Sequence, residues 1–155
     1  MESRDAHAEP PPDARRSALM SRVRGRHTSP EMVVRKALHR HGYRYRLHDK
    51  RLPGKPDLVL PRLRVVILVH GCFWHRHHGC RAASTPKTRT SFWEEKFARN
   101  VERDRRDIAA LERLGWRVHI VWECETNGRG GDFLPHTLAF LDEAEKSGSE
   151  DSLRG

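Results

Sequence analysis

Five consecutive apolar residues, Val65 to Val69, lead directly into the segment HGCFWHRHHGC at residues 70–80. A strand that is apolar at every position must be covered on both faces, so this run predicts a central strand with helices on either side. The chain leaves that strand at one edge of the sheet. There it carries four histidines, two cysteines, one arginine and two adjacent aromatic residues. This pattern predicts a functional site at the end of the central strand.

Apolar spacing and turn residues predict the remaining elements, in the order α-β-β-β-α-β-α. A helix is expected from Thr28, because Thr28-Ser29-Pro30-Glu31 offers a capping residue, an early proline and a glutamate, and Gly42 is a good terminator. The other expected elements are strands over 43–48, 57–60, 64–69 and 116–122 and helices over 91–114 and 133–145. Together they predict an α/β fold, with a mixed sheet flanked by helices.

The net charge indicates a polyanionic partner. Lys and Arg number 30 against 21 Asp and Glu among 155 residues, which gives +9 at neutral pH. A surplus of this size favours nucleic acid. A membrane surface is the alternative, but no basic amphipathic helix has a clean apolar face, and five apolar residues are too few to span a bilayer. Residues 1–20 have no apolar core of a secretory signal, so we expect a cytoplasmic protein.

The length favours one folded domain, expected over residues 28–145. Residues 1–15 contain three consecutive prolines and are expected to form a disordered tail, as are residues 146–155 at the other end. Residues 16–27 are rich in arginine and contain no acid. They are interpreted as a basic arm that follows a phosphate backbone, with a solvated basic tail as the alternative.

The three cysteines indicate a metal site. Cys72-x4-His77-x2-Cys80 supplies three ligands from one loop, and Cys124, just after the last strand, can complete the four tetrahedral ligands of zinc. The alternative is three buried thiols, although two of them stand among histidines and arginines. His78 is an alternative to His77 as the histidine ligand, and spacing alone does not decide between them.

The Pro56-Asp57 pair is a candidate for a second kind of metal site. A carboxylate that opens a strand can hold Mg²⁺, which prefers oxygen ligands. The following strand should deliver His70 and His75 to the same end of the sheet, and imidazole can activate water or protonate a leaving oxygen. In the alternative interpretation, Asp57 is a turn residue, His70 is satisfied by the backbone and His75 is a solvated residue or another zinc ligand.

Three aromatic residues in polar surroundings are candidates for contact with bases. Phe73 and Trp74 lie within the polar loop, and Trp93 lies at the start of the long helix. Large rings in basic loops can stack on bases or wedge between base pairs. In an extended loop Phe73 and Trp74 would point in different directions, so at most one is expected to pack inward.

Four long motifs then show a specific resemblance. LPGKPDLVL, HGCFWHRHHGC, TPKTRTSFWEEKFARNVERDRRD and LGWRVHIVWEC resemble the very short patch repair (Vsr) DNA mismatch endonucleases, over about residues 16–124. The resemblance implies a restriction-endonuclease-like fold, structural zinc and catalytic Mg²⁺. It implies an enzyme, acting as a monomer near the nucleoid, that nicks duplex DNA 5′ to the thymine of a T·G mismatch left by deamination of 5-methylcytosine. Other mismatch-repair proteins are conceivable partners.

The resemblance also assigns roles to residues of this chain. The implied catalytic residues are Asp57, His70, His75 and the supporting acid Glu31. Asp57 and the backbone carbonyl of Val69 would hold Mg²⁺. The implied zinc ligands are Cys72, His77, Cys80 and Cys124. Phe73, Trp74 and Trp93 would enter DNA from the major groove and Met20, in the basic arm, from the minor groove.

Two departures from the related patterns matter. The wider nuclease superfamily usually has a second acid and a lysine on the strand after the Pro-Asp, and Val65–Val69 has neither. Some family members have threonine in place of Val69, a change that a carbonyl ligand survives. Gly79 lengthens the histidine run and leaves the choice between His77 and His78 open.

Two other functions explain part of the pattern. A non-catalytic zinc module that binds DNA would account for the charge, the cysteines and the aromatic residues, but it leaves Asp57, His70 and His75 without a role. A zinc hydrolase would need an open coordination site, whereas two or three thiolates plus a histidine indicate a closed one.

Overall fold

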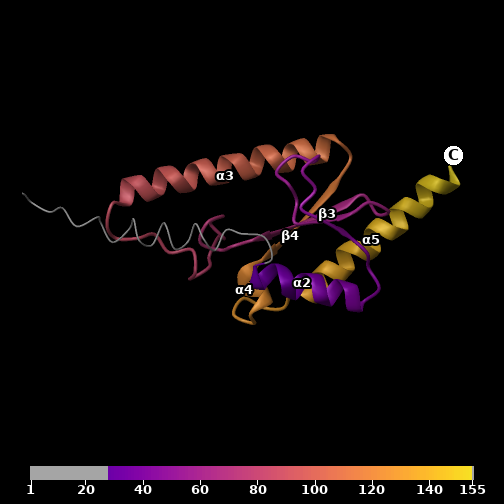
Figure 1. Ribbon diagram of the computed structural model, residues 1–155, viewed down its shortest axis with the longest axis horizontal. Coiled ribbons are helices and arrows are strands. Elements are labelled where there is room, and N and C mark those ends of the chain that lie inside the picture. Colours follow the sequence, from indigo (N-terminus) through magenta and orange to yellow (C-terminus); the bar gives the residue numbers. More distant parts are fainter. Residues whose placement is uncertain (1–27, 155) are drawn as a thin grey trace, which may run out of the picture.

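The structure is a computed structural model that describes residues 28–154. In this part of the chain one mixed sheet carries helices on both faces (Figure 1). The elements are α2 (Ser29–Arg40), β1 (Arg46–Leu47), β2 (Leu58–Leu60), β3 (Val65–His70), α3 (Thr90–Arg113), β4 (Arg117–Trp122), α4 (Glu123–Thr126) and α5 (Phe133–Leu153). The predicted order is confirmed, with the short α4 as an unpredicted addition. The predicted tail, the basic arm and Met20 lie outside the described residues.

The order of strands in the sheet is β1-β2-β3-β4. β2 runs antiparallel to β1 and to β3, whereas β3 and β4 are parallel, with Val65 opposite Arg117 and His70 opposite Trp122. α3 is the crossover connection between the two parallel strands. Consequently β3 and β4 both end at the same edge of the sheet, and the segments that follow them meet there.

Both faces of β3 are covered, as the apolar run predicts. On one face Val65 and Ile67 pack in a cluster that includes Val34 of α2 and Leu141 of α5. On the other face Val66 packs against Leu111 of α3. Figure 1 shows α3 on one side of the strands and α2 and α5 on the other. The sheet is therefore the middle layer of three.

α3 extends well past the sheet. Its 24 residues start over the loop that follows β3 and end near the start of β4 (Figure 1). Its buried residues are Trp93, Phe97, Asn100 and Leu111, spaced so that one face of the helix is covered. None of the helices within residues 28–154 is both long and apolar enough for a membrane span.

The C-terminal segment corrects a prediction. The closing helix was expected to end at about Glu145, with disorder over 146–155, but α5 continues to Leu153. No proline follows Pro135 in the sequence. Three serine hydroxyls on this stretch each donate to the carbonyl four residues earlier, those of Ser147, Ser149 and Ser152. With no proline to break it, the helix continues through this polar, serine-rich stretch, and the hydroxyls bond to the helix's own carbonyls.

Candidate active site and metal cluster

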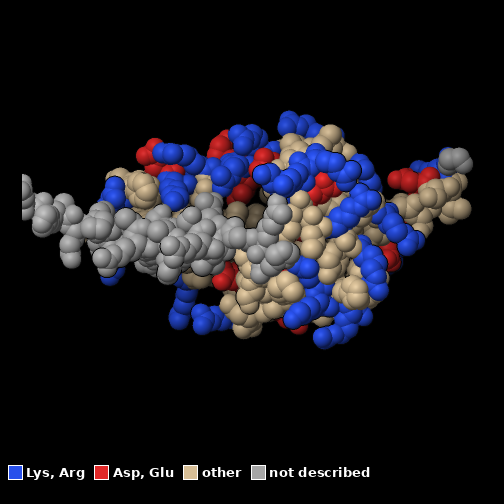
Figure 2. Space-filling view, in the orientation of Figure 1, with Lys and Arg blue, Asp and Glu red and all other residues tan. Residues whose placement is uncertain are grey.

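A cleft of about 670 Å³ opens where β3 ends. Its walls come from the start of α2, the turn before β2, the end of β3 and the central part of α3. The lining residues that carry polar chemistry are Thr28, Lys55, Asp57, His70, His75, Arg103, Asp104, Asp107 and Glu123. Figure 2 shows Lys and Arg spread over much of the face in view, which contrasts with the four carboxylates among the residues that line the cleft.

Asp57 lies at the start of β2, and its side chain is held in place by β3. The Val69 N–H donates to its Oδ2 at 2.8 Å. Burial raises the pKa of Asp57 to about 6, and the negative charge of Glu31 raises it further, while the Val69 hydrogen bond and the nearby His48 and His75 lower it. A carboxyl whose charge is disfavoured by burial and by a second carboxylate fits a site for a cation, because a cation would stabilise the ionised form.

Glu31 joins this site from the first turn of α2. Its backbone N–H donates to Oγ1 of the capping Thr28, and its buried side chain approaches Nε2 of His48 at 2.9 Å and Nη1 of Arg35 at 3.5 Å. The ligand atoms of Glu31, His48 and Asp57 all lie within 4.8 Å of one another. His48 was not singled out from the sequence. The only feature of the sequence that could have indicated His48 is its position in the polar stretch before the turn that leads to Asp57.

His75 is paired with an acid that the sequence analysis also missed. Its Nδ1 lies 2.6 Å from Oδ2 of Asp104 on α3. With Nδ1–H donating to the carboxylate, the Nε2 lone pair is free to accept a proton, and Asp104 stabilises the resulting imidazolium. In the sequence Asp104 stands between Arg103 and Arg105, which gives no sign of a pairing with His75. Only the fold shows that it faces the histidines.

His70, the last residue of β3, stacks on His75. The ring centroids are 3.8 Å apart and the planes differ by 7°. Burial, helped by the nearby His75, lowers the pKa of His70 to about 3, against the opposing effect of Asp104. His70 is therefore neutral at neutral pH.

Beside the cleft, three cysteines and one histidine gather in a cluster. The ligand atoms of Cys72, His77, Cys80 and Cys124 lie within 4.8 Å of one another. Nδ1 of His77 is 3.6 Å from Sγ of Cys72 and 3.4 Å from Sγ of Cys124, whose backbone N–H approaches Cys72 Sγ at 3.4 Å. His78 is exposed and does not belong to this group. The geometry thus brings together the predicted ligands, with His77 rather than its neighbour.

Trp122, at the end of β4, connects the cluster to the cleft. The ring of His77 stacks on it with centroids 4.2 Å apart and planes 7° apart. On the cleft side, His70 meets Trp122 edge to face at 5.4 Å. One indole therefore lies between the cysteine cluster and the stacked histidines and contacts His77 and His70.

The aromatic residues of the loop overturn one prediction. Phe73 and Trp74 are 9% and 8% exposed, so both pack inward, together with the buried Trp93 and Phe97 of α3. The loop is not extended: the His75 N–H donates to the Gly71 carbonyl, and the His77 N–H donates to the Cys72 carbonyl. These tight turns place successive side chains on the same side. In the described structure the candidate base-contacting rings form a packed cluster.

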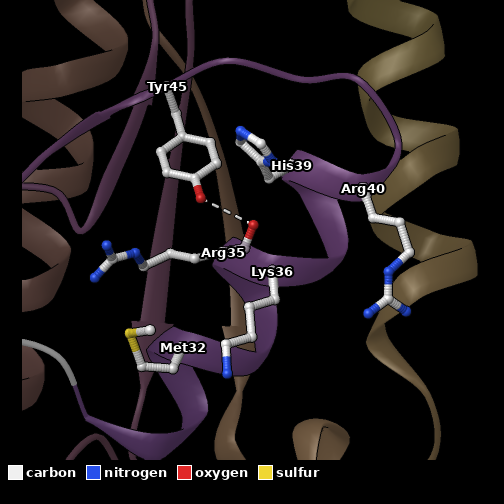
Figure 3. Close-up of a pocket in the computed structure, with 6 residues that line it drawn as sticks. All are labelled: Met32, Arg35, Lys36, His39, Arg40 and Tyr45. Carbon is white, nitrogen blue, oxygen red and sulfur yellow. Dashed lines mark hydrogen bonds between the residues drawn. The ribbon is translucent and has the colours of Figure 1, made fainter.

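Another hollow, of about 440 Å³, lies on the outer face of α2 (Figure 3). It is lined by Met32, Arg35, Lys36, His39, Arg40 and Tyr45. Tyr45 donates to the Arg35 carbonyl at 2.9 Å, which holds its ring against the helix. The lining contains no carboxylate, so it lacks the acids of the cleft, although Arg35 pairs with Glu31.

Gly130 offers a test of the cluster's packing. A Cβ at this position would lie 2.4 Å from Sγ of Cys124, closer than side chains approach one another. We expect Gly130→Ala to lower the free energy of unfolding by about 1–3 kcal/mol, as overpacking does, and to weaken metal binding by the cluster. Urea unfolding and metal content would be measured. Gly148→Ala is the control, since a Cβ there meets nothing within 4 Å. Equal free energies of unfolding and equal metal contents in the two variants would contradict the observed packing.

Comparison with known proteins agrees with the motifs at this site. The family described as DNA mismatch endonuclease Vsr matches residues 11–81. The Type II nicking enzyme V.XorIIP of Xanthomonas oryzae pv. oryzae is 53% identical over 116 residues, which cover 75% of this chain and 85% of that protein. The DNA mismatch endonuclease Vsr of Escherichia coli K12 is 51% identical over 116 residues, 75% of this chain and 74% of that protein. The Type II nicking enzyme V.NmeAIP of Neisseria meningitidis is 44% identical over 116 residues, which cover 75% of this chain and 82% of that protein. The chain therefore belongs to the Vsr family of DNA mismatch endonucleases.

Proposed function

We propose that this chain is a Mg²⁺-dependent endonuclease that nicks duplex DNA 5′ to the thymine of a T·G mismatch arising from deamination of 5-methylcytosine. The observation that carries the proposal is the meeting of Asp57, His70 and the His75–Asp104 pair in one cleft. Relatives with more than half of their aligned residues identical are named as a nicking enzyme and as a mismatch endonuclease. The basic surface suits a DNA substrate.

Asp57 would hold the cation, together with the backbone carbonyl of Val69, and Glu31 would support it from α2. Bound there, Mg²⁺ would activate water and neutralise charge that develops on the phosphate. The raised pKa of Asp57 supports this assignment, because burial of that carboxylate is unfavourable without a cation. Below a pH of about 6 protons would compete with the metal for Asp57.

His75 would take the proton from the attacking water. Its Nε2 is the nitrogen that remains when Nδ1 donates to Asp104, and the carboxylate would stabilise the imidazolium that forms. His70 is neutral and stacked on His75, so it would act as a hydrogen-bonding group toward the phosphate or the leaving oxygen. Asp104 is a positioning residue in this scheme.

The cysteine cluster would hold a structural zinc ion. A tetrahedral zinc with Zn–S bonds of about 2.3 Å and Zn–N bonds of about 2.0 Å requires S···N separations of about 3.5 Å. The separations from His77 to Cys72 and Cys124 are 3.6 Å and 3.4 Å. Three thiols and one imidazole fill all four positions, which favours a structural site over a hydrolytic one.

Phe73, Trp74 and Trp93 would enter the DNA beside the mismatch from the major groove, and Met20 would approach from the minor groove. Because the three rings are packed with Phe97, this role requires the aromatic cluster to open when DNA binds. A mismatched step is cheaper to unstack than a paired one, so insertion would itself favour the mismatch.

The remaining assignments follow from the same proposal. The mixed sheet with helices on both faces would be a restriction-endonuclease-like domain from residue 28 to the end of α5, preceded by a DNA-binding arm over 16–27. The protein would act as a monomer near the nucleoid, and other mismatch-repair proteins are further candidate partners. A non-catalytic zinc module for DNA binding is the alternative function. It gives no reason for a buried acid pair and a histidine–aspartate pair in one cleft.

The proposed function is tested with a panel of labelled duplexes that differ only at one base pair. In the presence of Mg²⁺ we expect a single nick 5′ to the thymine of T·G, and much slower cutting of T·A and C·G duplexes, because paired steps resist insertion. Denaturing gels map the cut strand and position. Flanking sequences would be varied in the same panel. Equal cutting of T·G and matched duplexes would disprove the mismatch claim, and no cutting with any divalent cation would favour the non-catalytic module.

The zinc assignment has a separate test. We expect about one zinc per chain in purified protein, lost in His77→Ala and retained in His78→Ala, because only His77 lies among the cysteines. Metal content is measured by atomic emission and thermal stability by circular dichroism. His77→Ala should also unfold at a lower temperature than His78→Ala, since bound metal stabilises the folded state. Zinc loss in the His78 variant instead would contradict the assignment.

A further inference from the structure

The charges that line the cleft raise a question about how a phosphate enters it. The lining contains four carboxylates, from Asp57, Asp104, Asp107 and Glu123. A phosphodiester is itself an anion, so these acids oppose its approach. A single divalent cation would balance only part of their charge. Groups of positive charge on the walls of the cleft are therefore needed to hold the substrate.

Among the lining residues only two carry a permanent positive charge, Lys55 and Arg103. Lys55 belongs to the turn that leads into Asp57, and Arg103 belongs to α3, next to Asp104. They therefore reach the cleft from two different walls. Lys55 stands two residues before Asp57, and Arg103 directly precedes Asp104.

Lys55 is held in an unfavourable backbone conformation. Its φ is +47°, in the left-handed region, and it directly precedes a proline, which further restricts its backbone. The turn is closed by the Lys55 N–H, which donates to the Leu52 carbonyl at 3.2 Å. It also presses against α3, because a Cβ on Gly54 would lie 3.0 Å from Cβ of Asp107. Strained, non-glycine residues concentrate at functional sites, and glycine would fit this conformation better.

Arg103 is oriented by a buried residue one turn earlier on α3. Its Nη2 donates to Oδ1 of Asn100 at 3.0 Å. Asn100 is 5% exposed, and its amide nitrogen lies 3.4 Å from the Trp74 carbonyl. The guanidinium is therefore fixed relative to the loop that carries His75, which reduces the entropy lost when it binds an anion.

We propose that Lys55 and Arg103 form a two-sided clamp that binds phosphate oxygens of the DNA strand to be cut. The inference rests on the proposed endonuclease function and names the residues that hold its substrate in the acidic cleft. Lys55 approaches the phosphate from the side of Asp57, and Arg103 from the side of the His75–Asp104 pair. In this clamp, the charge of Lys55 is the reason for a non-glycine residue at a position that glycine would fit better.

Lys55→Gly and Lys55→Gln separate this role from a structural one. Lys55→Gly relieves the backbone strain, so its melting temperature should equal or exceed that of the wild type. Nevertheless kcat/KM for nicking a T·G duplex should fall by about 10²-fold in both variants, the usual effect of removing one group that stabilises developing charge. Lys55→Arg should recover most of this loss, since it keeps the charge. Arg103→Gln should show a comparable loss.

Binding without divalent cation gives an independent measure of phosphate contact. The slope of log Kd against log salt concentration should decrease by about 0.9 in Lys55→Gln and in Arg103→Gln, one lost phosphate contact each. Lys50→Ala, an exposed lysine in the preceding loop, and Arg113→Ala, in the last turn of α3, are the matched controls and should behave as wild type.

The results distinguish the clamp from the function on which it rests. If the wild type does not nick any duplex, the proposed function fails, and an unchanged salt slope in the Lys55 and Arg103 variants would still reject the clamp. If the wild type nicks T·G and these variants match it, the clamp is wrong and the function stands. The clamp would also be wrong if Lys55→Gly lost activity together with a lower melting temperature while its slope of log Kd against log salt concentration stayed unchanged.

Discussion

The site depends on the parallel pairing of β3 with β4. That register places His70 opposite Trp122, so both strands end at the same edge of the sheet. The loop that follows β3 then carries Cys72 and His75, and α4, which follows β4, carries Cys124. Ligands that stand more than fifty residues apart in the chain meet only because of this edge. A one-residue slip would turn every side chain of one strand to the other face and separate them.

A second constraint is electrostatic. The chain has a net charge of +9, yet its cleft gathers carboxylates from the turn before β2, from α3 and from α4. Burial makes the charge of Asp57 unfavourable, and the nearby Glu31 adds to the effect. Ionised carboxylates in such an arrangement are stabilised by positive charge. A divalent cation and the cationic side chains of Lys55 and Arg103 on the walls of the cleft would supply it. In the proposed function, the basic exterior would attract DNA and the acidic interior of the cleft would act on its backbone.

Much of the fold could be predicted from local pattern. The apolar run Val65–Val69 predicted a covered strand, and the spacing of the cysteines predicted the cluster that the structure assembles. The pairing of His75 with Asp104 and of Glu31 with His48 could not be predicted, since both depend on the placement of distant elements. The choice of His77 over His78 likewise depends on how the loop turns.

Two predictions were wrong because they assumed local conformations that the chain does not adopt. Phe73 and Trp74 were expected on opposite sides of an extended loop, but its tight turns bring both rings inward against α3. The segment after Glu145 was expected to be disordered from its polar composition, but its serines bond within the helix. In the loop, backbone hydrogen bonds set the direction of the side chains, and in α5 no proline interrupts the polar stretch.

The central claim is that Asp57 binds the cation with which the cleft cuts DNA, while zinc at the cysteine cluster does no chemistry. Single-turnover nicking of a T·G duplex, titrated with Mg²⁺ in zinc-replete wild type and Asp57→Asn, tests this claim most directly. Binding of the duplex is measured in parallel by anisotropy. The account predicts saturable Mg²⁺ dependence in the wild type, and no nicking by Asp57→Asn despite unchanged zinc content and retained DNA binding. Nicking by zinc-replete wild type without added Mg²⁺, or wild-type rates in Asp57→Asn, would contradict it.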